Sequence, residues 1–234
     1  MGPQHWWPAG SAFEVIVGAY LTQNTAWTNV ERAMGNLRRA DVLSISGIRN
    51  TAIEALEQLV RPAGYFRQKA ARLKLFVAHL DINYGGSLET MFARQTSALR
   101  AELLGLPGIG PETADSILLY AANRETFVVD SYTRRIFGRH RMVKPETGYE
   151  EIRLAVQKAL TGEAQAEPWS AAILKIMPHT PSAASQMERS DLAQRYNEFH
   201  ALIVQTGKHF CVKGTPKCEN CPLREMLEAE KLKA

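Results

Sequence analysis

The chain has 234 residues, 45% of them hydrophobic, which is enough for one large or two small domains with apolar cores. Lysine and arginine outnumber aspartate and glutamate by 28 to 24, a mild basicity that suits nucleic-acid binding without establishing it. No apolar run is long enough to cross a bilayer and no signal peptide is recognisable, so we expect a cytoplasmic protein. The three cysteines, all within residues 211–221, do not form the pattern of a disulfide framework.

Hydrophobic periodicity predicts helices and no sustained strand, so the expected fold class is all-α. An aromatic stretch, Trp6-Trp7-Pro8, precedes the first expected helix at 13–21, which is almost entirely apolar. Two adjacent tryptophans there could equally belong to a hydrophobic core. Further helices are expected at 27–39, 48–59, 65–80, 96–104, 150–160, 169–177 and 187–205.

Two polar features accompany the early helices. The segment Leu21 to Thr25 (LTQNT) suits a turn followed by the N-cap of the next helix. In the helix at 65–80, the apolar residues from Ala70 to Leu80 are expected to face the core, and Lys69 and Arg72 to face the solvent.

A Gly/Pro-rich hairpin, Leu106-Pro107-Gly108-Ile109-Gly110, joins the helix at 96–104 to one that begins at Pro111. Pro107 fixes one φ angle, and the glycines allow φ values that a Cβ would disfavour. The free N–H groups of such a hairpin and helix start can bind an anion such as a phosphate. Most tight hairpins between helices only reverse the chain, so both interpretations stay open.

Asp130 follows the apolar run Phe127-Val128-Val129 and precedes a predicted helix. Aspartate is a preferred N-cap and needs no catalytic role in that position. The helix dipole also keeps such a carboxylate ionised, so the same residue is a candidate catalytic group.

The sequence LPGIG-PETA followed by VVD resembles the helix-hairpin-helix (HhH-GPD) DNA glycosylases, the superfamily of endonuclease III. In that family the hairpin amides hold the DNA backbone, and the aspartate, here Asp130, faces the sugar of a flipped-out nucleotide. The resemblance implies a monomeric base-excision-repair N-glycosylase that binds double-stranded DNA containing a damaged base. It also implies a central domain of residues 22–132 with the hairpin at 105–111, a second domain of residues 1–21 plus 133–210, and a Cys-rich loop at 211–227.

The resemblance also assigns DNA contacts. Gln23 occupies the position of a glutamine that enters the gap left by the flipped base. The other positions expected to bind DNA lie in the hairpin, in the helix that follows it and in the C-terminal loop: Leu106, Gly108, Gly110, Thr113, Lys213 and Lys217.

Bifunctional members of the family carry a lysine two residues beyond the second hairpin glycine. That lysine attacks the sugar, forms a Schiff base and cleaves the strand. Glu112 occupies this position and offers no amine, so we expect a monofunctional glycosylase with weak or absent lyase activity.

Other segments resemble the helix-hairpin-helix 3-methyladenine glycosylases: the opening Trp6-Trp7-Pro8, LTQNT, and RPAGYFRQKAARL. This resemblance implies a base pocket formed by Trp6, Trp7, Pro8 and Trp27. An N3- or N7-alkylated purine is cationic and binds aromatic rings by stacking and cation–π attraction. Two alternatives remain: an endonuclease III-type glycosylase/AP lyase for damaged pyrimidines, and a non-catalytic helix-hairpin-helix DNA-binding protein.

Cys211, Cys218 and Cys221 are spaced C-x6-C-x2-C, which resembles the first three ligands of the family's [4Fe–4S] loop. The fourth position is Leu227, which cannot bind iron. The cluster could be lost, or the fourth ligand could be an external thiol, water, or His209, Glu225 or Glu228. A [4Fe–4S] cluster is therefore a possible cofactor that the glycosylase chemistry does not require.

Overall fold

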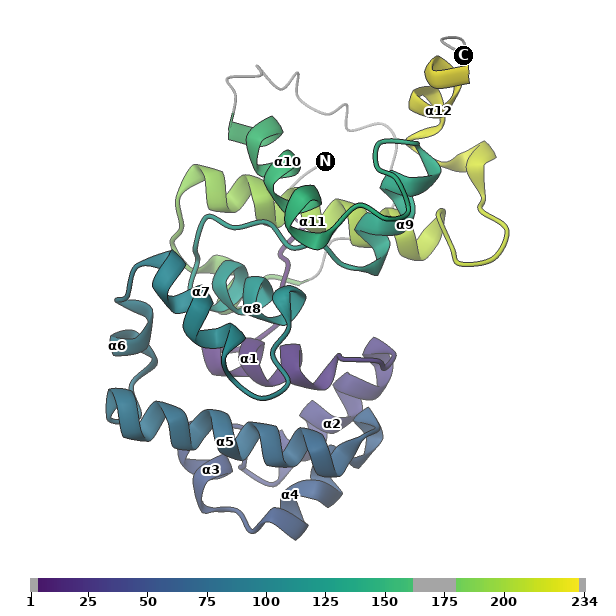
Figure 1. The fold of residues 1–234 in the computed structure, drawn as a ribbon. Coiled ribbons are helices and arrows are strands. Elements are labelled where there is room, and N and C mark those ends of the chain that lie inside the picture. The colour runs from purple at the N-terminus through teal and green to yellow at the C-terminus, as the bar shows by residue number, and fades with distance from the viewer. Residues whose placement is uncertain (1–3, 162–179, 232–234) are drawn as a thin grey trace. The chain divides into compact units, whose positions relative to one another are not determined.

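The computed structural model describes residues 4–161 and 180–231 (Figure 1). These residues form helices joined by turns, with no strand among them, so the all-α prediction is confirmed. Residues 169–177, where the sequence predicts a helix, lie outside the described ranges. Within the described part of the chain, no helix is long and apolar enough to span a membrane.

The chain divides into two compact units. The hairpin unit consists of residues 9–122, and the aspartate unit combines the residues up to Pro8 with those from Asn123 onward. The hairpin unit contains α1 (Ala12–Leu21), α2 (Trp27–Arg39), α3 (Ile45–Asn50), α4 (Ile53–Val60), α5 (Phe66–Tyr84), α6 (Leu88–Phe92), α7 (Thr96–Leu104) and α8 (Pro111–Ser116). The aspartate unit contains α9 (Ser131–Arg139), α10 (Tyr149–Thr161), α11 (Asp191–His209) and α12 (Arg224–Lys231).

Helix α1 lies at the centre of the hairpin unit, where it packs against α2, α5 and α8. Its N-terminus is capped by Ser11, whose side chain accepts a hydrogen bond from the Glu14 amide. From Val15 to Leu21 every residue is buried, because the helix is apolar on all sides. These contacts place α1 in the hairpin unit, whereas the domain limits implied by the resemblance begin the central domain at residue 22.

The single helix predicted at 48–59 is wrong, because the chain forms two helices there, α3 and α4. Thr51 and Ala52 are extended between them, with ψ angles of 132° and 147°. The Gly47 carbonyl accepts hydrogen bonds from both the amide and the hydroxyl of Thr51, so Thr51 closes the last turn of α3 before the chain becomes extended. The sequence also predicts neither the short helix α6 nor α12.

Helix α5 packs against α1, α3 and α4 and ends at Gly85 and Gly86, both with positive φ. The expectation that Lys69 faces solvent is wrong, because its side chain is only 2% exposed. Lys69 precedes Leu73 by four residues and Phe76 by seven, so it lies on the buried face of the helix.

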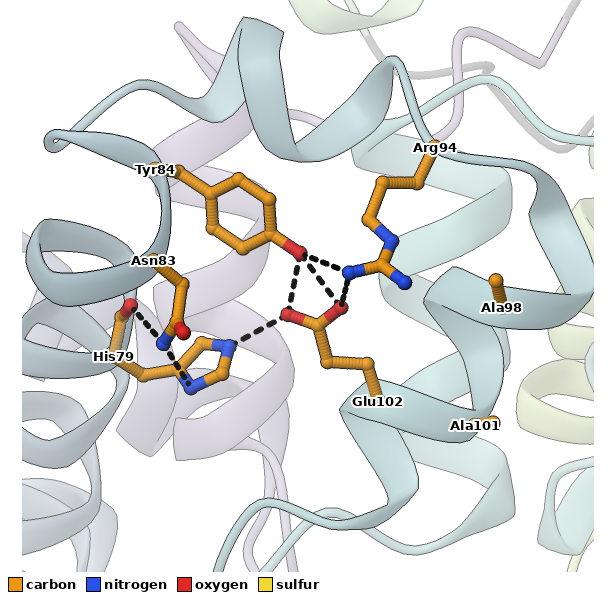
Figure 2. Close-up of a pocket in the computed structure, with 7 residues that line it drawn as sticks. All are labelled: His79, Asn83, Tyr84, Arg94, Ala98, Ala101 and Glu102. Carbon is orange, nitrogen blue, oxygen red and sulfur yellow. Dashed lines mark hydrogen bonds and ion pairs between the residues drawn. The ribbon is translucent and has the colours of Figure 1, made fainter.

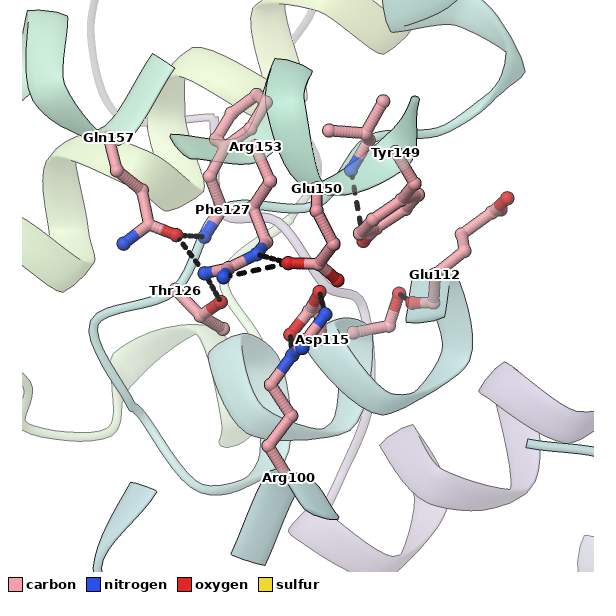
Figure 3. Close-up of polar contacts among 11 residues, drawn as sticks. Arg100, Glu112, Asp115, Thr126, Phe127, Tyr149, Glu150, Arg153 and Gln157 are labelled. Atoms are coloured by element: carbon pink, nitrogen blue, oxygen red, sulfur yellow. Dashed lines mark hydrogen bonds and ion pairs between the residues drawn. The ribbon is translucent and has the colours of Figure 1, made fainter. Parts of the chain in front are cut away.

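A buried ion pair joins α7 to α8, the two helices that flank the hairpin (Figure 3). Arg100 donates from Nε to Asp115 Oδ1 at 2.7 Å and from a terminal nitrogen to Oδ2 at 2.9 Å. The Asp115 side chain is fully buried. This two-pronged contact fixes the angle at which the two helices meet and so fixes the hairpin between them. Beyond α8 the chain continues as a π-helical turn, Ile117–Ala121.

Helix α11 packs against α9 and α10 in the aspartate unit. It begins at Asp191, four residues after the predicted start, because Ser190 is the N-cap and accepts a hydrogen bond from the Ala193 amide. The N-terminal segment is tied to the same helix, since the Gln4 amide donates to Glu198 at 2.8 Å.

Candidate DNA-binding and catalytic residues

Asp130 is the N-cap of α9, as the sequence predicts. Its Oδ1 accepts hydrogen bonds from the amide and the hydroxyl of Thr133 at 2.7 and 2.9 Å. Its Oδ2 lies 3.6 Å from Nε2 of His200 on α11. One oxygen therefore caps the helix, while the other faces an imidazole.

His200 is almost fully buried, with 4% of its surface exposed. Burial lowers the pKa of His200, and the negative charge of Asp130 opposes that shift. The neutral imidazole is therefore favoured beside the carboxylate. The sequence does not predict a role for His200, because a histidine in an amphipathic helix carries no signal that it lies near a residue 70 positions earlier.

The extended segment that leads to Asp130 is held by α10 (Figure 3). The Val129 amide donates to the Tyr149 hydroxyl at 3.3 Å, and the Phe127 amide donates to the Gln157 side chain at 3.4 Å. Arg153 donates to the same Gln157 oxygen and to Glu150. Residues of α10 thus fix the backbone that sets the position of the aspartate.

The hairpin places its two glycines in different environments. Gly108 has φ +79°, and a Cβ on it would collide with the guanidinium of Arg72. Gly110 has φ −93°, and a Cβ there would meet nothing within 4 Å. Ile109 is 6% exposed and anchors the turn in the core. Pro111 is the first residue of α8, where its missing N–H costs no hydrogen bond.

The structure brings Gln23 together with two predicted DNA-binding residues of the hairpin and α8. Gln23 Nε2 donates to the Gly108 carbonyl at 2.8 Å and to Thr113 Oγ1 at 3.0 Å. The opposite end of the same amide, Oε1, accepts a hydrogen bond from Arg72 at 3.2 Å. Both ends of the Gln23 side chain are therefore held by residues of the hairpin unit.

Lys69 supports the backbone of the same loop. Its Nζ donates to the carbonyls of Leu21, Gln23 and Ala63 at 2.9, 2.8 and 2.8 Å. Burial and the neighbouring charge of Arg72 lower the pKa of Lys69 to about 8. The helical spacing from Leu73 and Phe76 could have shown that this lysine is buried, but not which carbonyls it contacts.

The aromatic residues of the predicted base pocket fall in both units. Trp6 and Trp7 are each 7% exposed, with ring centroids 6.0 Å apart, and the Lys208 ammonium lies 5.6 Å from the centre of the Trp6 ring. Pro8, half-buried, follows them. Trp27, also half-buried, belongs to the hairpin unit and donates from its ring nitrogen to Glu31 at 2.9 Å. A pocket shared by all four residues stays a prediction.

The remaining predicted contact positions are accessible. Lys213 and Lys217 are exposed on the C-terminal loop, and Leu106 is half-buried in the hairpin. Glu112 is exposed in the first turn of α8, and its carbonyl accepts a hydrogen bond from the Ser116 hydroxyl at 2.7 Å.

The three cysteines line one pocket of about 270 Å³. Arg139 donates to Cys211 Sγ at 3.2 Å, and burial together with the other two cysteines raises the pKa of the Cys221 thiol. Sulfur ligands beside a cationic donor fit an anionic iron–sulfur cluster. Leu227 forms part of the same wall, as the spacing predicts, so that side is apolar.

One imidazole, that of His140, lines the pocket together with the cysteines, and no carboxylate among the described residues does. His209 and Glu225 are exposed and do not line the pocket, and the side chain of Glu228 is outside the described ones. Across the part of the chain that the structure describes, no group of three His, Cys, Asp or Glu residues is arranged to hold a single metal ion.

A second pocket, of about 600 Å³, lies in the hairpin unit (Figure 2). The Glu102 carboxylate at its centre accepts hydrogen bonds from His79 and Tyr84 and pairs with Arg94 at 3.0 Å. Burial would raise the pKa of Glu102, but these contacts outweigh it and lower the pKa. The sequence does not predict this cluster, because its residues come from separate helices and form no local motif.

Residues 17–161 match the model of the HhH-GPD superfamily base excision DNA repair protein. A Methanocaldococcus jannaschii protein named as a DNA repair glycosylase is 43% identical over 225 residues, which cover 96% of this chain and 89% of that protein. Endonuclease III of Thermotoga maritima is 27% identical, over 92% of this chain and 82% of its own.

Solved structures have the same fold. The Helicobacter pylori 3-methyladenine DNA glycosylase MagIII, bound to 1,N6-ethenoadenine, matches with a TM-score of 0.69 and 31% identity, covering 88% of this chain and 89% of that one. A trapped endonuclease III–DNA intermediate matches with a TM-score of 0.67 at 20% identity, covering 96% and 87% of the two chains. The chain belongs to the HhH-GPD superfamily and is a DNA glycosylase of base excision repair.

Proposed function

We propose that this glycosylase is monofunctional: it flips a damaged base out of double-stranded DNA, hydrolyses the N-glycosidic bond with the help of Asp130, and leaves the strand uncut. The observation that carries the proposal is the arrangement of the Asp130 carboxylate. One oxygen is fixed by Thr133 at the start of α9, and the other is directed toward a buried histidine.

The chemistry needs an ionised carboxylate close to the sugar. Departure of the base builds positive charge on the sugar, which a nearby carboxylate stabilises. The same group can accept a proton from the attacking water. Asp130 lies at the N-terminal end of α9, and the neutral His200 adds no positive charge that would hold the carboxylate in a salt bridge.

The position of Glu112 supports the absence of strand cleavage. A Schiff base needs a primary amine that attacks the sugar carbon. Glu112 occupies the place in the first turn of α8 where bifunctional relatives carry that amine. Hydrolysis by water, with Asp130 as the base, then leaves an intact strand with an abasic site.

The best substrate candidate is an N3- or N7-alkylated purine such as 3-methyladenine. The 31% identical MagIII structure supports this class, since its title names a 3-methyladenine glycosylase. Trp6 and Trp7 supply two neighbouring rings, and stacking with cation–π attraction favours a base that already carries positive charge. Such a base leaves without prior protonation, so the pocket needs no general acid.

DNA contacts are proposed for one compact group in the hairpin unit. The hairpin around Gly108 and Gly110 offers backbone amides to phosphate oxygens, with Thr113 beside them. Gln23, which contacts Gly108 and Thr113, would enter the gap that the extruded base leaves. Lys213 and Lys217, exposed on the C-terminal loop, add positive charge toward the DNA backbone.

A [4Fe–4S] cluster is proposed for the pocket of Cys211, Cys218 and Cys221, with Arg139 as a hydrogen-bond donor to sulfur. The sequence similarity to endonuclease III supports this assignment. The cluster would supply a cross-link that holds the C-terminal loop, and no step of the hydrolysis depends on it.

A panel of duplexes, each with one defined lesion, tests the proposal. The protein is incubated with each duplex, and the strand is then analysed with and without alkali treatment. Release of 3-methyladenine or 7-methylguanine, with strand breaks only after alkali, is the expected result. Faster release of a damaged pyrimidine, with breaks that need no alkali, would favour an endonuclease III-type glycosylase/AP lyase instead.

A further inference from the structure

We propose that Lys69 is a positioning residue, whose ammonium group holds the loop that carries Gln23. The side chain of Gln23 is thereby docked on the helix-hairpin-helix hairpin before DNA binds. This inference rests on the proposed role of Gln23 in the gap left by a flipped base. It assigns a function to a buried charge that the glycosylase chemistry itself does not use.

The contacts of Lys69 connect helix α5 to two other segments of the chain, residues 21–23 and Ala63. Its acceptors are the last carbonyl of α1, at Leu21, the carbonyl of Gln23 in the following loop, and the carbonyl of Ala63 before α5. An ammonium group has three N–H donors, so donors and acceptors are matched one to one. The Leu21 carbonyl has no acceptor role inside α1, and the negative end of that helix faces the positive charge.

A buried lysine that only stabilises the fold would not be expected to contact a residue proposed to bind DNA. Here one of the three carbonyls belongs to Gln23 itself, and the side chain of that residue donates to the hairpin at Gly108 and Thr113. Lys69 thus holds the backbone of Gln23, while the hairpin holds its side chain.

Arg72, three residues beyond Lys69 on α5, holds the other end of the same amide. It donates to Gln23 Oε1 at 3.2 Å and lies against Gly108, where a Cβ would collide with it. Helix α5 therefore fixes Gln23 twice, at the backbone through Lys69 and at the side chain through Arg72. The hairpin and the gap-filling side chain form one preassembled group within the hairpin unit.

Removing the ammonium should release the loop. The protein would then have to order Gln23 each time it binds DNA, and that ordering weakens binding and excision. We expect Lys69→Met to lower both the affinity for a duplex with an abasic-site analogue and the single-turnover excision rate by about tenfold, the ratio that one ordered side chain can supply.

A double-mutant cycle with Gln23→Ala separates positioning from a general loss of stability. If Lys69 acts through Gln23, the double variant has the same affinity and single-turnover rate as the single variant with the larger loss.

Lys74→Met is the matched control, since Lys74 lies on the same helix and donates to a single carbonyl, that of Arg49. It should leave both quantities unchanged. All assays are run at least ten degrees below the lowest melting temperature of the set.

Hydrogen–deuterium exchange gives a readout that does not depend on catalysis. In Lys69→Met the amides of residues 21–25 should exchange faster, and those of α3 should not. If this variant does not fold, Lys69→Gln, which keeps two N–H donors without the charge, takes its place in the cycle.

Two results would overturn the inference: losses from the Lys69 and Gln23 variants that multiply in the double variant, or unchanged affinity with unchanged exchange at 21–25. A wild-type protein that excises no lesion would contradict the proposed function, whereas affinity for the abasic-site duplex and the exchange data would still decide the role of Lys69.

Discussion

At the scale of single residues, His200 makes stability depend on pH in a defined direction. Its pKa is lowered by burial, so the folded protein binds fewer protons at this group than the unfolded chain does. The stability that neutral His200 contributes is fully present when the pH is above 6.5, the ordinary pKa of histidine. It is lost as the pH falls through the lower pKa that His200 has in the folded protein.

We therefore predict that the melting temperature falls more steeply in wild type than in His200→Gln as the pH is lowered from 7.5 to about 5. Differential scanning calorimetry at a series of pH values measures both slopes. Parallel curves for the two proteins would show that His200 does not titrate in this way.

Glu112 tests the lyase prediction by gain of function. Glu112→Lys places a primary amine in the first turn of α8, at the position that bifunctional relatives use. Borohydride should trap a covalent adduct between this variant and a duplex with a damaged base. Wild type should release base without adduct, and efficient trapping by wild type would show that another lysine attacks the sugar.

At the scale of elements, the hairpin offers a pair of glycines that differ in backbone conformation. Gly108→Ala combines a positive φ with a collision against Arg72, so we expect a loss of about 1–3 kcal/mol in the free energy of unfolding. Gly110→Ala has ordinary φ and open space, so it should change that free energy by less than about 1 kcal/mol. Urea unfolding of both variants gives the comparison, and equal losses would mean that the hairpin conformation is not as described.

The C-terminal loop is the second element with a sharp test. Protein purified without oxygen should be brown and contain iron and sulfide, and Cys218→Ser should remove the colour. Because Leu227 lines the pocket where a fourth ligand would be, the cluster should decay in air. A colourless, iron-free protein that is folded and active would show that Arg139, with its contacts to residues 211–214, holds the loop without metal.

At the scale of the whole molecule, local signals were predictable from the sequence and long-range contacts were not. The cap at Asp130 follows from neighbouring residues, and the sequence predicts it correctly. The limits of α2 and α7 also agree with the prediction, but the expected polar N-cap of α2 within residues 21–25 is wrong, because Ala26 is the N-cap and makes no side-chain hydrogen bond. The break between α3 and α4 lies at Thr51 and Ala52, whose extended backbone the hydrophobic periodicity does not reveal.

The residues that contact Asp130 and Gln23 in the candidate site could not be predicted, because they come from helices distant in sequence. His200 meets Asp130, and Lys69 meets Leu21 and Gln23, only after helices distant in sequence have packed together. The resemblance to DNA glycosylases predicts roles for Asp130 and Gln23, but it assigns no role to His200 or Lys69.

The central claim is that the carboxylate of Asp130 assists hydrolysis of the N-glycosidic bond. Asp130→Asn keeps an N-cap for α9 and removes the ionised carboxylate, so the fold and the affinity for DNA should be retained. Single-turnover excision of 3-methyladenine or 7-methylguanine by this variant is the most direct test. We predict a fall of about 10²–10⁴-fold with an unchanged dissociation constant for the duplex. An excision rate close to that of wild type would contradict the account.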